Sequence, residues 1–368
     1  MTQISRIYIS IVFLLICSLA SAQNEIVNLS GPKFLSLSSQ LPEDLTRERV
    51  IVVISVPSKQ SGRFEIRGNW KDLAQKSHKF FRQIGVDPVG YIYQDDINAG
   101  PEVKSAYLEL LSSRQVKNIV MVEQSGSATE VNYTLTVTPF APEGFVTNGQ
   151  LGWRDTHEEL ERVMIRLGRQ VLRQELTRSN LLIPEFPEYL NDLVVFKGNR
   201  LENYPSRLAS LKLAVVKFQE VKISSEMNQA LIDQVNAYNL EVAEKNKRIV
   251  EIMSQYPFQY DLVDASDEDQ LYKMGYQYAL MPLSSTGRSI KRILNYQSLK
   301  TETHYVSSRF DAQGNGLLER IPVDANATKY YIKQTIVKDV HTGEWDADAT
   351  WDLAMHNFVY NLRKAFRR

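Results

Sequence analysis

The chain has 368 residues, 43% of them hydrophobic, and its 43 basic and 43 acidic residues give a formal net charge of zero. This apolar content is ample for packed cores and excludes a generally disordered protein. The charge balance gives no support for electrostatic capture of nucleic acid or of anionic lipid. The length predicts two domains rather than one.

The first 22 residues have the pattern of a cleaved secretory signal. Arg6 precedes the almost wholly apolar residues 7–16, and Ala20, Ser21 and Ala22 then provide small residues for a signal peptidase. The apolar run is too short to span a bilayer comfortably, and no later stretch is long enough. We therefore expect a mature protein that is exported, soluble, without a transmembrane helix and periplasmic.

The only cysteine, Cys17, lies inside this signal. A lipoprotein signal would place a small residue before the acylated cysteine, whereas Ile16 stands there, which argues against lipidation. Cleavage after Ala22 leaves a chain of 346 residues without cysteine. Such a chain is held by core burial alone, which fits a large α/β protein of a bacterial periplasm.

The first half of the mature chain predicts an irregular lead-in and one α/β module. Residues 23–46 form the lead-in, and residues 47–177 form the module. Hydrophobic periodicity and turn residues predict the following order: strand 49–57, helix 69–84 ending at Gly85, strand 89–93, helix 101–114, strand 118–122, strand 131–137 and closing helix 155–176. Thr156 and Glu159 are spaced as a capping box that would open the closing helix.

The second half repeats this order after an ordered connector over residues 178–208. The second module spans residues 209–368 and carries an insertion over 284–328. Its predicted elements are strand 211–218, helix 225–255, strand 258–263, helix 267–274, strand 278–281, strand 330–340 and helix 350–366. Residues 119–122 map onto residues 278–281 with a shift of 159.

We therefore predict an α/β (α+β) fold with two related β-α-β-α-β-β-α modules that contain mixed sheets. The repeated order predicts an internal duplication. The second copy differs by its long helix and by a β-hairpin insertion.

The second module resembles a group of bacterial envelope modules. Residues 339–344 read D-x-x-T-G-E after the strand-like residues 331–337, and residues 213–216 form an apolar opening strand. These features are similar to the TolB amino-terminal domain, the CsgG fold and the LpoB-type activators of penicillin-binding proteins. The resemblance implies an envelope location and a binding or scaffolding role, with no catalytic residues to carry over. The first module lacks this turn, in which we expect Gly343 to supply a positive φ.

One segment has the spacing of a calcium loop. Asp311, Gln313, Asn315 and Glu319 match oxygen-ligand positions 1, 3, 5 and 9. The twelfth position, which supplies two ligand oxygens in such loops, is Pro322. We therefore prefer a glycine-rich hairpin tip, with calcium as the alternative, and expect no other cofactor.

Acidic residues follow corresponding strands of the two modules. Asp95 and Asp96 follow one strand, and Asp264 and Asp267 follow its counterpart. The carboxyl edge of an α/β sheet is where ligands bind, so these residues are candidates for a small-molecule site. Arg288, in residues 284–289, is a further candidate as part of a phosphate cradle, although we expect that segment to be a plain loop.

Other catalytic and metal motifs are missing from the sequence. The five histidines have no zinc spacing, and the sequence contains neither a G-x-S-x-G motif nor a nucleotide-binding glycine motif. No nucleophile or paired acid and base can therefore be named.

The helix predicted from residue 225 is longer than a small domain is wide, at ~45 Å for ~30 residues. Leu231, Val235, Tyr238 and Val242 lie along its apolar stripe. Either the helix overhangs its sheet, or a second chain covers the excess, so we treat a homodimer through these residues as a hypothesis.

The sequence is best explained by a non-catalytic envelope protein that binds a protein partner or assembles with itself, without nucleic acid. One alternative is a periplasmic protein that binds a small solute between two lobes. Another is an envelope-glycan hydrolase, which requires two facing carboxylates that the sequence does not identify.

Overall fold

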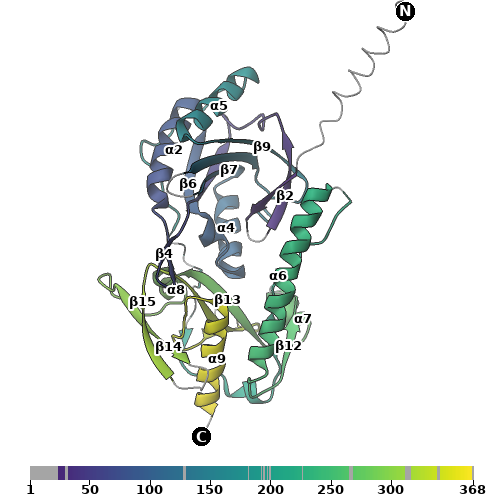
Figure 1. Ribbon diagram of the computed structural model, residues 1–368, viewed down its shortest axis with the longest axis vertical. Helices are drawn as coiled ribbons and strands as arrows, with labels where there is room; N and C mark the ends of the chain where they lie inside the picture. Colours follow the sequence, from purple (N-terminus) through teal and green to yellow (C-terminus); the bar gives the residue numbers. More distant parts are fainter. Residues whose placement is uncertain are drawn as a thin grey trace, which may run out of the picture.

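The computed structural model describes residues 24–29, 32–126, 130–180, 182–191, 193, 195–196, 198, 200–225, 227–264, 268–310, 316–337 and 340–366. Figure 1 shows two α/β modules that follow one another along the long axis of the molecule. Residues 1–23, and with them the predicted signal, lie outside the described residues.

The first module is built on a seven-stranded mixed sheet with the order β1-β2-β9-β8-β7-β3-β6. Its centre is parallel, since β3 pairs in that direction with both β6 and β7, whereas β8 is antiparallel to β7 and to β9. β2 is parallel to β9 and antiparallel to β1. The strands are β1 (Asn24–Asn28), β2 (Pro32–Ser38), β3 (Arg49–Ser55), β6 (Asp87–Tyr93), β7 (Val116–Gly126), β8 (Val131–Pro139) and β9 (Gln150–His157).

Helices cover both faces of this sheet. Val50, Val52 and Ile54 of β3 pack in the cluster that holds α2 (Trp70–Ile84) and α5 (Leu160–Arg173). Ile51 and Val53 face the opposite cluster, which holds the short α3 (Gln94–Ile97) and α4 (Pro101–Ser113). Burial on both faces explains why β3 is apolar at every position of its centre.

The second module has a six-stranded mixed sheet with the order β10-β17-β16-β13-β11-β12. Its strands are β10 (Arg200–Leu201), β11 (Leu213–Val216), β12 (Tyr260–Val263), β13 (Tyr278–Thr286), β16 (Asn326–Gln334) and β17 (His341–Thr342). Its helices are the 3-10 turn η1 (Ser206–Ala209), α6 (Gln229–Met253), α7 (Glu268–Lys273), α8 (Gly287–Ile293) and α9 (Trp351–Phe366). Among the described residues there are also two separate hairpins: β4 (Lys59–Ser61) with β5 (Phe64–Ile66), and β14 (His304–Phe310) with β15 (Gly316–Pro322).

The two sheets share the order and direction of six strands. The series β6-β3-β7-β8-β9-β2 corresponds to β12-β11-β13-β16-β17-β10, with a parallel centre followed by two antiparallel pairings and a final parallel one. The prediction of an α/β fold with two similar mixed sheets is therefore confirmed. That the similarity arose by duplication stays a prediction.

Two boundaries in the first module were predicted wrongly. The lead-in is not irregular, because it contains β1 and β2. Residues 155–157 do not open a helix but end β9, where the Thr156 hydroxyl lies 3.0 Å from that of Thr134. Glu159 is the N-cap of α5 without a side-chain cap, so the capping-box prediction is wrong. The pairing of Thr156 with Thr134 in the sheet therefore outweighs the local preference for a helix that the Thr156 and Glu159 spacing indicated.

Two turn predictions in the second module also need correction. Thr286 caps α8 by accepting a hydrogen bond from the Ser289 amide at 3.3 Å, so the segment predicted as a loop starts a helix. Gly343 is not among the glycines with positive φ. A Cβ there would lie 3.1 Å from Nζ of Lys329, so close approach of a buried lysine explains the glycine.

The modules share a continuous core. One cluster of buried residues joins Ile51 and Tyr107 of the first module to Ala279 and Met281 of the second. α6 reaches the first module as well: in Figure 1 it runs upward to lie beside β2, and Phe34 of β2 packs in one cluster with residues of α6. The second sheet therefore packs against the first module on one face and against α6 and α9 on the other.

Candidate functional site

The β14–β15 hairpin is the most distinctive feature of the second module. It projects from the body of the molecule in Figure 1, and it lies between β13 and β16, where the first module passes directly from β7 to β8. Its strands pair from His304 opposite Pro322 to Phe310 opposite Gly316. The sequence predicted this hairpin, with a strand on each side of the glycine-rich residues 311–316.

The two faces of the hairpin differ in burial. Tyr305 and Ile321, which pair with each other, are 3% and 0% exposed. On the opposite face, Val306 and Leu318 are 52% and 80% exposed, and Leu317, which shares the face of Ile321 but lies nearer the hairpin tip, is 53% exposed. One face therefore anchors the hairpin, and the other presents large apolar side chains to solvent.

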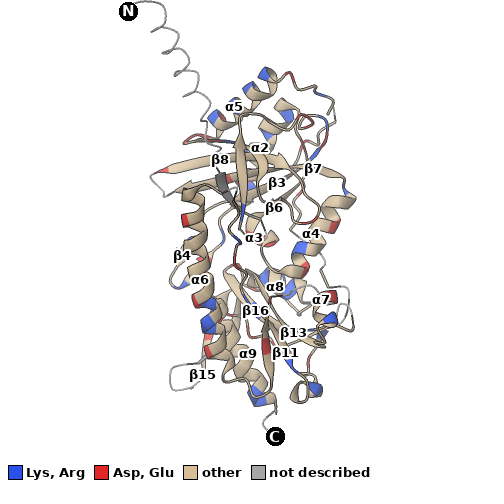
Figure 2. Cartoon of the chain, turned by 90° about the vertical axis from the view of Figure 1, so that its right-hand side faces the viewer, with Lys and Arg blue, Asp and Glu red and all other residues tan. Residues whose placement is uncertain are grey.

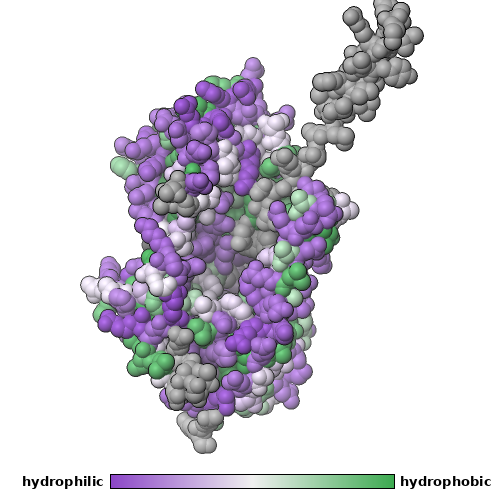
Figure 3. Space-filling model, in the orientation of Figure 1, coloured by the Kyte–Doolittle hydropathy of each residue, from purple (hydrophilic) through white to green (hydrophobic). Residues whose placement is uncertain are grey.

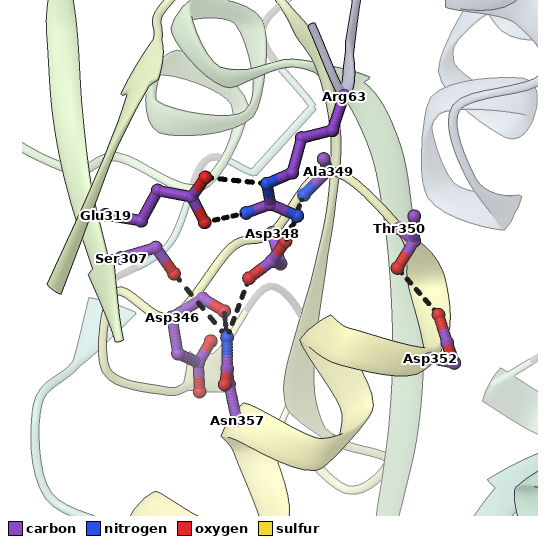
Figure 4. Close-up of polar contacts among 9 residues, drawn as sticks. All are labelled: Arg63, Ser307, Glu319, Asp346, Asp348, Ala349, Thr350, Asp352 and Asn357. Carbon is purple, nitrogen blue, oxygen red and sulfur yellow. Dashed lines mark hydrogen bonds and ion pairs between the residues drawn. The ribbon is translucent and has the colours of Figure 1, made fainter. Parts of the chain in front are cut away.

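An arginine from the first module forms ion pairs that hold the hairpin in place (Figure 4). Arg63 lies between β4 and β5, and its guanidinium forms an ion pair with both carboxylate oxygens of Glu319 on β15. Its Nη1 also donates to Oδ1 of Asp348 at 3.2 Å. This fork joins the first module, the hairpin and the segment before α9, and bidentate pairing of this kind fixes geometry as well as charge.

A second set of contacts fixes the other strand of the hairpin. Nδ2 of Asn357 on α9 donates to Oγ of Ser307 at 3.5 Å and to Oδ2 of Asp348 at 3.4 Å, as Figure 4 shows. It also lies 3.4 Å from the backbone oxygen of Asp346. Both strands of the hairpin are thus tied to one polar cluster.

This cluster is buried and internally paired. Nζ of Lys329 lies 2.6 Å from Oδ1 of Asp346, and the two side chains are 0% and 1% exposed. Burial raises the pKa of Asp346, and the charge of Lys329 opposes that rise. Burial likewise raises the pKa of Asp348, which Arg63 opposes. Because Asp346 and Asp348 are closed off from solvent, the cluster serves to hold elements together rather than to meet a substrate.

An open groove lies beside the hairpin base. It has a volume of about 810 Å³ and contains Leu299, which is 74% exposed. Its lining also includes His304 and Arg320 of the hairpin. The groove and the outer face of the hairpin together form a surface on which exposed apolar side chains (Leu299, Val306 and Leu318) lie beside Arg320 in a mostly polar lining.

A second polar site lies where the modules meet. Nη1 of Arg67 lies 2.8 Å from Oδ1 of Asp96, and the same oxygen accepts a hydrogen bond from Oγ of Ser285 at 3.2 Å. The site thus joins the carboxyl ends of β6 and β13. Burial raises the pKa of the neighbouring Asp95, and the charge of Arg67 opposes that rise. The cavity here is about 10 Å³, the size needed for a single water molecule, so the site is closed.

The structure does not bring the acidic candidates of the two modules together. Asp96 pairs with Arg67, whereas Asp264 is exposed and pairs with Lys217 at 3.0 Å. Asp267 lies outside the described residues. Asp96 and Asp264 therefore each have a partner within the chain, and the ligand site at these edges stays a prediction.

Arg288 is also engaged within its own module. Its Nε donates to Asp324 at 3.0 Å and its Nη2 to the backbone oxygen of Glu302 at 3.1 Å. A phosphate would have to compete with both contacts, so the predicted cradle is not supported.

The predicted calcium ligands are only partly visible. Asp311, Gln313 and Asn315 lie outside the described residues, and the remaining candidate, Glu319, is paired with Arg63. Within the ranges that the structure describes, no group of three or more histidine, cysteine or acidic side chains is placed to hold a metal ion. Calcium binding thus stays a prediction without support from Glu319.

The stripe predicted to bind a second chain faces inward. Leu231, Val235 and Val242 are 2–3% exposed. Leu231 and Val235 pack with Phe34 of the first module, and the Tyr238 hydroxyl donates to the backbone oxygen of Gln219 at 3.4 Å. The part of α6 that extends beyond its own sheet is therefore covered by the first module of the same chain. The predicted dimer contact through these residues is wrong, because the side chains of Leu231, Val235 and Val242 are already buried.

The residues that matter most in the hairpin anchor were not identified from the sequence. Arg63 is distant in sequence from Glu319 and Asp348, and no local pattern links them. Lys329 offered one signal: a lysine inside the apolar residues 327–332 needs a buried partner, because an unpaired buried charge is strongly unfavourable. That partner, Asp346, is identified only by the fold.

None of the helices in the described part of the chain has both the length and the apolarity that crossing a bilayer requires. No protein-family model matches the sequence, and no curated protein matches it. The resemblance to the TolB, CsgG and LpoB modules therefore stays a prediction, and the fold and the anchored hairpin are the basis for the function.

Proposed function

We propose that this protein is exported to the bacterial cell envelope and there binds a protein partner, or assembles with itself, without catalysing a reaction. The observation that carries the proposal is the anchored hairpin. Leu317 and Leu318 are exposed on β15, while the same strand is tied to the core through Glu319 and Ile321. The predicted signal over residues 1–22 supports the location.

Rigid presentation of apolar side chains favours binding. A fixed hairpin loses little conformational freedom when a partner docks, so more of the burial energy contributes to affinity. Hydrophobic residues reach the surface at the lower left of Figure 3, where Figure 1 places β14 and β15. The neighbouring groove of about 810 Å³ enlarges this surface, and Arg320 favours a partner with an acidic rim.

The ion pairs formed by the aspartates that were candidates for a ligand site support a role without catalysis. Asp96 and Asp264 each pair with a cation of the same chain, and so does the buried Asp348. A glycosidase needs two carboxylates that face each other across the substrate. Solute binding between lobes is likewise disfavoured by the cavity of only about 10 Å³ at the module junction.

Site-specific photo-crosslinking in the cell tests the proposal. The full chain would carry a photoreactive residue in place of Leu318, or in place of Leu240 of α6 as a control, since these leucines are 80% and 71% exposed. We expect one adduct of defined mass from position 318 in the periplasmic fraction and none from position 240. A mass of two chains would identify self-assembly, and a larger or smaller one would identify a different partner.

Two further results bear on the same proposal. Replacement of both Leu317 and Leu318 by serine should abolish the adduct formed from a probe at Val306, while leaving the unfolding transition of the purified protein unchanged. Retention of the chain in the cytoplasm, or identical adducts from positions 318 and 240, would contradict it.

A further inference from the structure

Although the whole chain has a net charge of zero, one layer of the first module is strongly basic. α2 and α5 form the outermost layer of the first module, and together they carry eight basic and two acidic residues, a net charge of +6. Every one of the eight is exposed. Figure 2 shows the blue basic residues along α5 at the upper end of the molecule.

The arginines of α5 share one side of the helix. Arg162, Arg166, Arg169 and Arg173 recur at steps of three and four residues, while Val163 and Leu167 face the core. Helix geometry therefore sends the arginine side chains outward as a row.

An open groove of about 360 Å³ runs between this row and β9. Arg154 of β9 lines it together with Arg166, Arg169 and Arg173. Arg166 is paired with Asp155 at 2.9 Å. Within the described part of the chain, Arg169 and Arg173 have no carboxylate in ion-pair contact, so their charges face solvent uncompensated.

A second basic groove lies near the carboxyl end of α2. It has a volume of about 580 Å³ and is lined by Lys79 and Arg82 of α2 and by Arg178. The two grooves extend the positive charge across the whole layer rather than confining it to one pocket.

Large apolar side chains stand among these charges. Leu172 is 77% exposed and Ile165 is 37% exposed, and their seven-residue spacing places them on one side of α5. A helix that combines arginines with exposed leucine or isoleucine is suited to the boundary between lipid headgroups and acyl chains. An enclosed small-molecule site would instead bury its ligand in a concave pocket.

We propose that the outer face of α2 and α5 docks on a membrane surface rich in anionic phospholipids. Arg169 and Arg173 contact headgroup phosphates, for which the guanidinium fork is well matched, and Leu172 enters the boundary below them. The charge complementarity between a layer of +6 and an anionic surface supplies the attraction. This surface is separate from the β14–β15 hairpin, so the two proposals can fail independently.

Vesicle co-sedimentation of the purified mature chain tests this inference. The vesicles contain phosphatidylcholine alone, or phosphatidylcholine mixed with phosphatidylglycerol. We expect binding to the mixed vesicles only, and weaker binding as salt rises, because ions screen exposed charges. The double variant Arg169→Gln/Arg173→Gln should bind about 25-fold more weakly, since each basic residue near an anionic surface contributes a factor of about five.

Two matched variants separate the proposed contact from general charge attraction. Arg207→Gln/Lys273→Gln removes the same charge from exposed positions of the second module and should bind like the wild type. Leu172→Ser keeps every charge and should still weaken vesicle binding several-fold. Far-UV circular dichroism and the unfolding midpoint of each variant establish that it is folded.

Three outcomes would overturn the inference. These are no binding to the mixed vesicles at low salt, equal loss in the two double variants, and full displacement from vesicles by millimolar glycerol phosphate. The last result would show a site for a free small anion instead of a lipid surface.

Discussion

At the scale of single residues, the interior of the protein contains ion pairs between buried charged side chains. Lys329 and Asp346 form an ion pair with 0% and 1% exposure, and Lys333 reaches Glu102 of the first module at 2.8 Å. Removing one member of such a pair leaves a buried charge without a partner and costs about 3–5 kcal/mol. These pairs therefore specify which elements meet, whatever their net contribution to stability.

The buried His341 is expected to make the stability of the protein depend on pH. Its Nε2 lies 3.1 Å from the backbone oxygen of Leu294, and burial lowers its pKa from 6.5 to about 4. Arg200 and Lys329 lower this pKa further, whereas Glu102 raises it. Between these two pKa values the unfolded chain binds the proton more readily than the folded chain, so stability falls as the pH falls through this window.

We predict that His341→Gln removes about 3 kcal/mol of the stability loss between about pH 7.5 and about pH 4. Glutamine retains a donor for the Leu294 oxygen but does not titrate. Urea unfolding of both proteins at the two pH values gives the difference directly. His78 and His356 also have lowered pKa values and remain in both proteins, so they cancel. Equal pH dependence in wild type and variant would show that His341 titrates normally.

At the scale of elements, side-chain hydrogen bonds hold α6 in addition to its packing on the second sheet. Asn246 accepts a hydrogen bond from the Phe218 amide at 2.9 Å and donates to the Phe218 oxygen at 3.0 Å. Asn239 makes the same two contacts with Val221, both at 2.9 Å. The seven-residue spacing puts both asparagines on one side of the helix, so they bind residues 218–221 like an additional strand.

We predict that Asn246→Ala lowers the free energy of unfolding by about 1–2 kcal/mol, because two backbone groups lose their partner. Amide hydrogen exchange should accelerate at Phe218 and its neighbours. The matched control is Asn236→Ala, an exposed position of the same helix, which should leave both quantities unchanged. Unchanged exchange at Phe218 in Asn246→Ala would show that the segment is held by other contacts.

At the scale of the whole molecule, the two modules form one unit with a shared core. The Ser284 amide donates to the Ala99 oxygen at 2.7 Å, which places β13 against the start of α4. The neighbouring Gly100 leaves room for this contact, because a Cβ on it would lie 2.9 Å from the backbone oxygen of Pro282. The Pro282 oxygen is a backbone atom, so it cannot move aside as the end of a flexible side chain could.

We predict that Gly100→Ala destabilises the protein by about 1–3 kcal/mol through overpacking where the modules meet. Thermal unfolding followed by calorimetry measures the effect. Gly144→Ala is the control, because its nearest heavy atom would lie at an ordinary 3.8 Å. If both variants have the same unfolding midpoint as the wild type, the contact between Gly100 and Pro282 has room for a methyl group, which would contradict the prediction.

The sequence predicted the site less well than the fold. The sequence suggested Asp96 as a ligand-binding residue and Glu319 as a calcium ligand, whereas each pairs with an arginine from a distant position, Arg67 and Arg63 respectively. The net charge of the whole chain does not indicate the basic layer, because acidic residues elsewhere cancel the positive charge of α2 and α5. Local patterns cannot report such long-range pairings.

Periodicity and turn residues by themselves predicted the α/β class, the two similar mixed sheets, the C-cap at Gly85 and the hairpin beyond His304. These features depend on which residues alternate along one short segment, and that information is local. Only the tertiary structure decided that β2 joins the first sheet, that α6 is covered by its own chain and that Arg63 anchors the hairpin. Each of those outcomes depends on residues that are far apart in sequence and become neighbours only when the two modules pack together.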